Sequence, residues 1–394
     1  METTEEKLWN SNYLKVWTAN FLIFFSFMLL APLLPLYLSE TFAADRQTIG
    51  LVLSGYTITA LLIRPLSGYL ADSFERKQVL LVCYSLFAVF FVGYLVAGTL
   101  LLFTIVRTLH GAPFGATTVA NSTVAIDTLP SSRRAEGIGY YGLSNNIAAA
   151  IAPTFALLLL KQTRSYQLIF TLATLTAFAG VVINSRLELK PRPLVYHKQV
   201  FSLDRFFLTR AWCESGVIAS MSFAYGVVST YVAIYGKEEL DITGGTGVFF
   251  LLLAGGLILS RLVGGRSLGK GHIGRNAAMG LLLSLGGYLL FAALHNPVGY
   301  YGAALVVGLG NGHAYPALQN MFINLASSHQ RGTANSSLLI SWEVGMGLGV
   351  LAGGALAQHW GYHSAFWAAW AVNLLGVLFF FAYVRAHFER RRLQ

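Results

Sequence analysis

The sequence is poor in charged residues, and this scarcity excludes an ordinary soluble domain. Only 11% of its 394 residues are Asp, Glu, Lys or Arg, whereas a soluble domain carries about 25%. The apolar fraction is 55% and the mean hydropathy is +0.59. We therefore expect an integral membrane protein.

Cysteine is also scarce. Cys83 and Cys213 each lie in an apolar run without a nearby partner, so we expect two separate core thiols and neither a disulfide nor a metal site. The first residues, METTEEKLWNSNYLKVW, are acidic and polar and lack a cleavage site of small residues. They do not resemble a signal peptide, and the first apolar run is expected to remain as a membrane span.

Long apolar runs dominate what is present. A membrane-spanning helix needs about 20 mainly apolar residues. Twelve such runs are found, at 13–38, 48–70, 78–97, 99–126, 136–160, 167–184, 209–235, 243–264, 276–294, 299–323, 335–357 and 364–386. They predict an all-α membrane protein with twelve transmembrane helices.

The Lys and Arg residues predict the orientation of these helices. Nearly all those between spans fall on one side, and the loops of the other side hold only Arg46, Lys161, Arg164 and Lys237. Because positive residues favour the cytoplasm, both termini are expected there. This explains the net charge of +10 without a nucleic-acid partner. Short loops and compact length favour a bacterial inner membrane.

A constant offset of about half the chain length relates the two halves of the sequence. It pairs Arg64 with Arg261, Gly111 with Gly308, and Gly115 with Gly312. Such matches predict tandem six-helix units in the same orientation, as in transporters with parallel repeats. The predicted domains are two pseudo-symmetric six-helix bundles, 1–184 and 209–394, joined by a polar, basic cytoplasmic linker at 185–208.

One loop interrupts the apolar pattern with a cluster of charges. It reads Gly68-Tyr-Leu-Ala-Asp72-Ser-Phe-Glu75-Arg76-Lys77. This spacing resembles the signature loop of the major facilitator superfamily, Gly-x-x-x-Asp-Arg-x-Gly-Arg-Arg, although Ser73 and Glu75 depart from it. The resemblance implies that Asp72 faces the start of the eleventh helix, near Asn335, and helps to hold the outward-facing state. Gly68, Asp72 and Arg76 are therefore predicted gate residues.

Further stretches extend the resemblance over the whole chain. Arg107 and Gly111, with His110 between them, are similar to the fourth-helix motif Arg-x-x-Gln-Gly, whose Arg is tied to proton transfer in proton-coupled members. Ala152-Pro153 lies where the fifth-helix antiporter motif has Gly-Pro. APLLPLYL resembles the first-helix signature of drug exporters. The resemblance implies an exporter that exchanges its substrate for protons. Pro153 and the repeat-related Arg64 and Arg261 complete the predicted gate.

Ionisable groups within a membrane are costly, so each one is a functional hypothesis. Glu343 lies near the middle of the eleventh run and is the predicted proton carrier. A structural hydrogen bond is its alternative role. The full proton-coupling set predicted here is Glu343, Arg107, Glu214, Asp127 and His313.

Polar and aromatic residues within the spans predict the substrate contacts. Asn311, Tyr315 and Gln319 recur every four residues and so share one helix face. The resemblance places helices one, four, seven and ten around the central path, with five and eleven adding to its walls. The predicted substrate-binding set is Asn20, His110, Asn145, Asn146, Tyr225, Asn311, Tyr315, Gln319 and Trp342. Bridges between helices are the alternative for each.

The predicted function is export of a small molecule, drug-like or metabolic, by alternating access. We expect a monomer in contact with small molecules, protons and membrane lipids, with no cofactor and no catalytic activity. A proton gradient would supply the energy. Coupled uptake of a sugar, amino acid or other nutrient is the first alternative, and a receptor without transport is the second. The substrate class stays open between lipophilic drugs, sugars and anionic metabolites such as metallophores.

Overall fold

The computed structural model describes residues 7–31, 33–44, 46–189, 206–242 and 246–393. Its contacts divide the chain into two compact units. Unit 1 comprises Met1–Arg133, Tyr141–Phe207 and His329–Ser336, and unit 2 comprises Arg134–Tyr140, Leu208–Ser328 and Ser337–Gln394. Each unit therefore includes one short segment from the other half of the chain. His329–Ser336 of the second half belongs to unit 1, and Arg134–Tyr140 of the first half belongs to unit 2. Most of the predicted linker, 190–205, lies outside the described residues.

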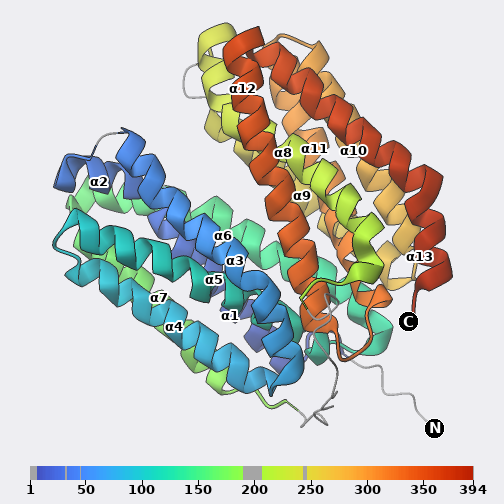
Figure 1. The fold of residues 1–394 in the computed structure, drawn as a ribbon, viewed down its shortest axis with the longest axis horizontal. Helices are drawn as coiled ribbons and strands as arrows, with labels where there is room; N and C mark the ends of the chain where they lie inside the picture. Colours follow the sequence, from blue (N-terminus) through green and yellow to red (C-terminus); the bar gives the residue numbers. More distant parts are fainter. Residues whose placement is uncertain (1–6, 32, 45, 190–205, 243–245, 394) are drawn as a thin grey trace. The chain divides into compact units, whose positions relative to one another are not determined.

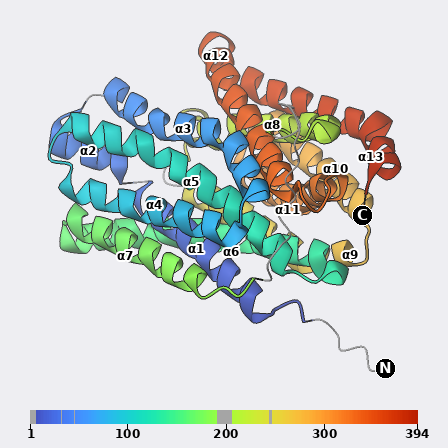
Figure 2. The same ribbon diagram turned by 60° about the horizontal axis from the view of Figure 1, so that its bottom comes forward.

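The described residues of unit 1 include the helices α1 to α5, most of α6, α7 and the start of α12 (Figure 1). Within it, α5 packs against α3 and α4, and α1 packs against α7 (Figure 2). Side-chain caps begin several helices: the side chains of Asn10, Thr99 and Ser165 accept hydrogen bonds from the first turns of α1, α5 and α7. The elements are α1 (Ser11–Leu30), α2 (Leu34–Phe42), α3 (Arg46–Ser73), α4 (Arg76–Val96), α5 (Leu100–Thr128), the 3-10 turn η1 (Ser131–Arg133), α6 (Arg134–Thr163) and α7 (Tyr166–Ser185).

The first predicted span, 13–38, is not one continuous helix. α1 ends at Leu30, and α2 begins at Leu34 with Pro35 in its first turn. Proline has no amide hydrogen to donate, so it is tolerated in the first turn of a helix, where Pro35 lies. The first predicted span thus consists of two helices, and the stretch Ser11–Phe42 that contains them is apolar enough to cross a membrane.

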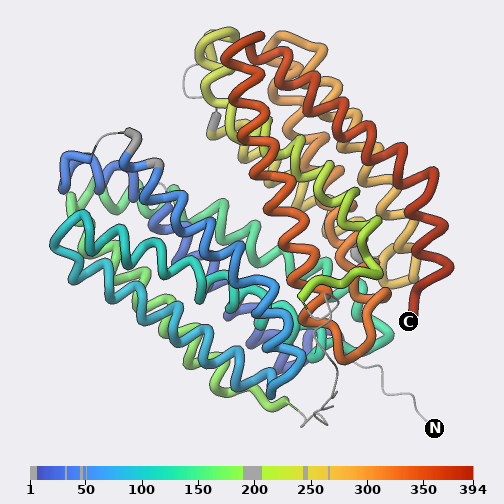
Figure 3. The backbone as a smooth tube through the Cα atoms, viewed as in Figure 1, coloured from blue at the N-terminus to red at the C-terminus, as the bar shows by residue number. Residues whose placement is uncertain are grey.

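Unit 2 contains the helices of the second half of the chain. In it, α11 packs against α9 and α10. Gly361, at φ 82°, interrupts α12, and Figure 3 shows the chain reversing direction within this element. The elements are η3 (Thr209–Ala211), α8 (Trp212–Glu239), α9 (Thr246–Gly269), α10 (Ile273–Ala293), α11 (Pro297–Leu325), α12 (Arg331–Phe379), the π-helical turn η4 (Phe380–Val384) and α13 (Arg385–Arg391).

Each predicted span is mostly helical over its described residues, with departures at span edges and at the break within the first span. By length and composition, nine helical stretches of the described chain are apolar enough to cross a membrane, and the stretch Arg331–Arg391 contains both of the last two predicted spans. The helices α5 and α11 are not among the nine; they carry the buried polar residues Arg107, Asn121 and Asn311. The predicted all-α membrane fold is confirmed, because no strand occurs in the described residues.

The two units repeat the same glycine contacts. In unit 1, a Cβ atom added to Gly111 or Gly115 would strike the backbone carbonyls of Tyr56 or Ala60 on α3. In unit 2, the same addition to Gly308 or Gly312 would approach the carbonyls of Leu253 or Leu257 on α9. The glycines and the residues that they contact are related by the same offset between the two halves of the chain. The repeat in the sequence therefore corresponds to a repeated packing of one helix against another.

A further glycine, Gly345 of α12, allows a test of close packing in unit 2. A Cβ atom there would lie 2.7 Å from the Cα atom of Ala219 on α8, whereas a Cβ at Gly347 would meet no atom within 4 Å. Overpacking costs about 1–3 kcal/mol, so Gly345→Ala should lower the unfolding midpoint in detergent by about 3–10 °C. Gly347→Ala is the matched control and should be neutral or stabilising. Equal midpoints for the two variants would contradict the close contact.

Candidate functional site

Asp72, near the end of α3, binds the start of α12. Its Oδ1 atom accepts a hydrogen bond from the backbone nitrogen of Gly332 at 2.9 Å. Its Oδ2 atom accepts from the backbone nitrogen of Thr333 at 2.8 Å and from the Thr333 hydroxyl at 3.0 Å. The first amides of a helix lack partners within it, and the helix dipole favours an anion there. The structure thus places Asp72 at the helix that the resemblance indicated, at Gly332 and Thr333 rather than at Asn335.

Two glycines allow the backbones to approach at this point. A Cβ atom on Gly68 would lie 2.9 Å from the carbonyl oxygen of Gly332, and one on Gly332 would lie 2.6 Å from that of Gly68. Larger side chains would separate α3 from α12 and lengthen the hydrogen bonds of Asp72. The four-residue spacing of Gly68 and Asp72 therefore has a structural reason, since it puts the glycine one turn from the carboxylate on the same helix face.

Two arginines and two acids alternate beside this contact. Arg76, at the start of α4, binds Asp72, with 3.2 Å between Nη2 and Oδ1, and also pairs with Asp127 of α5. Asp127 in turn accepts from Nη1 of Arg331 at 2.7 Å. Asp127 was predicted as a proton-coupling residue, but the structure places it among these ion pairs. We name Asp72, Arg76, Asp127 and Arg331, with the amides of Gly332 and Thr333, the gate cluster.

Arg107 of α5 is the centre of a buried aromatic site in unit 1. Its side chain is only 5% exposed, and its guanidinium carbon lies 3.9 Å from the centroid of the Tyr56 ring. Its Nη1 atom donates to the Tyr94 hydroxyl at 3.2 Å, and that hydroxyl lies 2.9 Å from Nδ1 of His110. Among the described residues, the buried Nε of Arg107 finds no hydrogen-bond partner. Arg107 and His110 were predicted separately, and Tyr94 joins them.

A second polar site in unit 1 surrounds Asn20 of α1. Asn20 donates to Ser144 at 2.8 Å and to Asn145, and it accepts from the Tyr141 hydroxyl at 2.7 Å. Asn121 of α5 donates to the same hydroxyl at 2.8 Å. The network joins α1, α5 and α6 and brings the predicted residues Asn20 and Asn145 together. Asn146 lies beside it in sequence, and its buried Nδ2 atom has no partner among the described residues.

Three predicted substrate residues of unit 2 form an aromatic cluster. The Trp342 ring on α12 lies 5.6 Å from that of Tyr225 on α8 and 5.3 Å from that of Tyr315 on α11, centroid to centroid. The Tyr315 ring stands nearly perpendicular to Trp342, at 88°. Such edge-to-face contacts are favourable and present both apolar faces and hydroxyl groups.

The other predicted residues of unit 2 lie along the same helices. Asn311 of α11 accepts from the Ser284 hydroxyl at 2.8 Å. His313 uses Nδ1 toward the Leu309 carbonyl of its own helix at 2.9 Å. Gln319 is also buried. Asn311 and His313 are thus held by bonds that a structural role would also explain.

Glu343, the predicted proton carrier, lies on α12 next to Trp342 in sequence and is half-buried. It therefore shares the helix whose first residues Asp72 binds. Arg261 of α9 is 5% exposed and interacts electrostatically with Tyr315 of α11. Its counterpart Arg64 donates to Thr118 of α5 at 3.0 Å. Thr118 and Tyr315 are related by the same offset as the two arginines, which extends the repeat to the buried charges.

Glu214, in the first turn of α8, is completely buried and pairs with His387 of α13, with 3.1 Å between Oε1 and Nδ1. The structure therefore places Glu214 at the beginning of α8, in hydrogen-bond contact with His387 of the last helix. Pro153, a predicted gate residue, lies inside α6 and is half-buried.

Several site residues were not predicted. They are Tyr56, Tyr94, Asn121, Tyr141, Ser144, His387 and Arg331. Buried asparagine in an apolar run is a signal that was available for Asn121, because a polar group at membrane depth requires a partner. The tyrosines carried no such signal, since most of the 19 in the chain were expected at the membrane interfaces.

The family model described as Major Facilitator Superfamily matches residues 16–338 and 277–393. The chain belongs to the major facilitator superfamily. This superfamily member is therefore an integral membrane transporter. Within the described residues, no group of three or more His, Cys, Asp or Glu side chains is placed to hold a metal ion.

Bacterial relatives of this superfamily member are named mainly as exporters. It is 23% identical over 86% of its length to the staphylopine export protein of Staphylococcus aureus, covering 87% of that protein. It is 22% identical over 91% of its length to the multi-drug resistance efflux pump PmrA of Streptococcus pneumoniae, covering 92% of it. It is also 27% identical over 91% of its length to the maltose permease of Geobacillus stearothermophilus, again covering 91%.

Solved structures show the same fold. The human organic anion transporter MFSD10 (TETRAN) matches with a TM-score of 0.80 at 16% identity, over 94% of this chain and 99% of that one. A variant of the Escherichia coli fucose:proton symporter FucP matches with a TM-score of 0.77 at 16% identity, over 95% of this chain and 99% of that one.

Proposed function

We propose that this transporter exports a small organic molecule in exchange for protons. The relatives named as export proteins and efflux pumps support the direction. The observation that carries the coupling is that α12 holds both the amides bound by Asp72 and the acid Glu343. The two positions lie roughly 16 Å apart along one helix at 1.5 Å per residue.

In the proposed cycle, protonation of Glu343 changes the charge on α12, and the gate cluster sets whether the start of α12 stays bound to α3. Breaking the Asp72 contact costs the hydrogen bonds to Gly332 and Thr333, and remaking it restores them. A proton that binds Glu343 from the outer side and leaves to the inner side would drive substrate the other way. Asp127 is assigned to the gate in this scheme rather than to proton transfer.

The side chains support an amphipathic substrate with a flat apolar part. Tyr225, Tyr315 and Trp342 of unit 2 offer aromatic faces, and Asn20 and Asn145 of unit 1 offer amides. Arg107 supplies a buried nitrogen atom without a partner among the described residues, and its positive charge favours an acidic group on the substrate. We further propose a monomer in a bacterial inner membrane with both termini in the cytoplasm, driven by the proton gradient and without a cofactor.

Uptake is the second candidate function. The maltose permease is a relative over nearly the whole chain, and the fold matches that of a fucose:proton symporter. In this case protons and substrate would move in the same direction, and the amides around Asn20 would bind hydroxyl groups of a sugar.

The proposal is tested with purified protein in liposomes that enclose a pH dye. Addition of lipophilic cations, sugars, amino-acid conjugates and metallophores should reveal a compound whose movement is opposed by protons. Glu343→Gln should then abolish substrate-driven proton flux, because glutamine cannot bind and release a proton. Glu188→Gln, at an exposed acid, is the matched control and should keep full flux.

The outcomes separate the candidates. Proton flux in the direction of the substrate would establish uptake and reject export. Proton-dependent transport that persists in Glu343→Gln would reject Glu343 as the proton carrier. Substrate binding without flux of any compound would favour a receptor.

A further inference from the structure

Unit 2 has a basic cavity at the end where α8 begins and α13 finishes. The cavity has a volume of about 270 Å³, and the described residues that line it are Arg210 and Arg391. Arg210 lies in η3, just before α8, and Arg391 is the last residue of α13. Both side chains are exposed. Neither residue belongs to the gate cluster or to the proposed substrate contacts. The proposed transport mechanism therefore gives no reason for two arginines to line the same cavity.

In the described part of the chain, the acids near this cavity also interact with other groups. The acid of α13, Glu389, pairs with Arg392, with 3.3 Å between Oε2 and Nη2. Glu214 interacts electrostatically with Arg391, but its Oε1 atom is bound to His387 and the side chain is fully buried. The exposed surface of the cavity therefore presents two guanidinium groups. Guanidinium groups bind phosphate oxygens through paired hydrogen bonds.

Three aromatic rings, of which Trp212 and Tyr383 are exposed and Phe379 is half-buried, lie beside the same end of α8. Trp212 follows Arg210 by two residues and is 56% exposed. Its ring lies 6.4 Å from Phe379 and 6.4 Å from Tyr383, and the last two are stacked at 6.0 Å. Tryptophan and tyrosine favour the level of the lipid headgroups. The aromatic surface would then contact the glycerol and upper acyl chains of a lipid whose phosphate reaches the arginines.

We propose that Arg210 and Arg391 bind the phosphate of an anionic phospholipid, with its glycerol and acyl chains against Trp212, Phe379 and Tyr383. Basic pockets of this kind on the cytoplasmic side of membrane proteins bind anionic headgroups. The cavity has room for a phosphate group but not for acyl chains, which must lie outside along the apolar rings. The proposal does not depend on the substrate or on the direction of transport.

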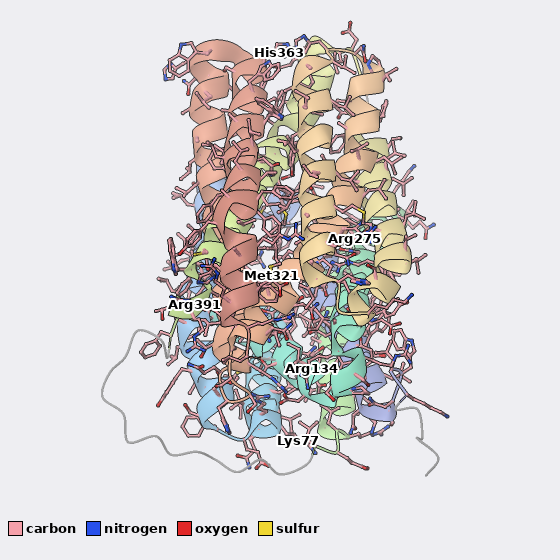
Figure 4. The ribbon with its side chains drawn as sticks, turned by 90° about the vertical axis from the view of Figure 1, so that its right-hand side faces the viewer. Lys77, Arg134, Arg275, Met321, His363 and Arg391 are labelled. Atoms are coloured by element: carbon pink, nitrogen blue, oxygen red, sulfur yellow. The ribbon has the colours of Figure 1, made fainter. Side chains whose placement is uncertain are left out.

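The test is a lipid titration of the full chain in detergent, followed by native mass spectrometry. Phosphatidylglycerol should bind in preference to phosphatidylcholine. The double variant Arg210→Gln, Arg391→Gln should weaken phosphatidylglycerol binding by about 30-fold, since each basic residue near an anionic lipid contributes on the order of a fivefold factor. Lys270→Gln, Arg275→Gln removes the same charge at exposed residues where α9 and α10 meet, and should bind as the unchanged protein does. Figure 4 labels Arg275 and Arg391 apart from each other, at the right and the left of that view.

Further measurements identify the ligand and show whether each variant is folded. Arg391→Lys keeps the charge and should keep most of the affinity, and thermal unfolding of each variant reports its fold. Inorganic phosphate and glycerophosphoglycerol, which lack acyl chains, should compete only at far higher concentrations. Equal binding of phosphatidylcholine, or equal loss of binding in the Lys270, Arg275 control, would overturn the proposal. Competition by inorganic phosphate at lipid-like concentration would show a free-phosphate site and overturn it as well.

Discussion

Asp72→Asn is expected to lower the transport rate by about 10- to 100-fold while the protein still folds and binds substrate. Asparagine keeps the shape of the side chain but presents an NH₂ group where one carboxylate oxygen now accepts from Gly332 or Thr333. Two donors then face each other, and the ion pair with Arg76 is lost as well. Hydrogen bonds to a charged group contribute about 1.5–3 kcal/mol, and each 1.4 kcal/mol is about a tenfold change in a conformational equilibrium. Transport rates in liposomes and substrate affinity by calorimetry measure the two effects separately.

Glu75→Gln is the control for Asp72→Asn. It makes the same change of charge three residues away, at a side chain that is exposed, and should leave the rate within about twofold, as exposed charges contribute little. Thr333→Val removes only the hydroxyl contact and should have an intermediate effect. If Asp72→Asn transports as fast as the unchanged protein, the contact with α12 is only a topological anchor and the gate assignment is wrong.

Arg107→Lys is expected to reduce substrate-driven proton flux by about 100-fold. Lysine keeps the charge but lacks the planar group that lies over Tyr56 at 3.9 Å, and its single nitrogen cannot reproduce the geometry toward Tyr94. Arginine and lysine are not equivalent at a stacked, buried site. The flux assay described above measures the loss, and binding of the transported compound shows whether affinity falls with it.

Two companion variants make the Arg107 result interpretable. Arg186→Lys is the matched control, because Arg186 is exposed after α7, and it should have no effect. Tyr94→Phe removes the hydroxyl that Arg107 and His110 share and should produce a smaller loss of flux. Wild-type flux in Arg107→Lys would mean that position 107 needs only a positive charge and that the aromatic site is structural.

The membrane helices were predictable because their apolar runs are long and the membrane thickness fixes their length. The departures lie where the regular backbone changes. The break between Leu30 and Leu34 precedes a helix with Pro35 in its first turn, and the predicted last span continues through a π-helical turn to Arg391. Hydropathy alone gives no sign of either feature, because both occur within apolar sequence.

The individual site residues were easier to predict than their partners. Asp72 and Arg107 were found because they are charged in an apolar chain and match motifs. Tyr94 and Tyr141 were missed because tyrosine is common at membrane interfaces, and only the packing of α4 on α5 and of α6 on α1 gives their hydroxyls a role. A contact such as that of Glu214 with His387 joins residues far apart in sequence. No feature of a single sequence indicates that these two residues are partners.

The segment His329–Ser336 has a consequence for how the chain is made. It packs as part of unit 1, yet more than a hundred residues of unit 2 must be synthesised after Phe207 before it exists. At about 5–20 residues per second, the interval between the synthesis of Phe207 and that of this segment is on the order of ten seconds. Throughout this interval, the carboxylate of Asp72 lacks the amides that it binds in the finished protein. By then every other segment of unit 1 has been synthesised. Unit 1 can therefore complete its folding only late in translation. Biogenesis factors that bind nascent membrane proteins could act during this interval, and the unpaired carboxylate of Asp72 is a group that they could recognise.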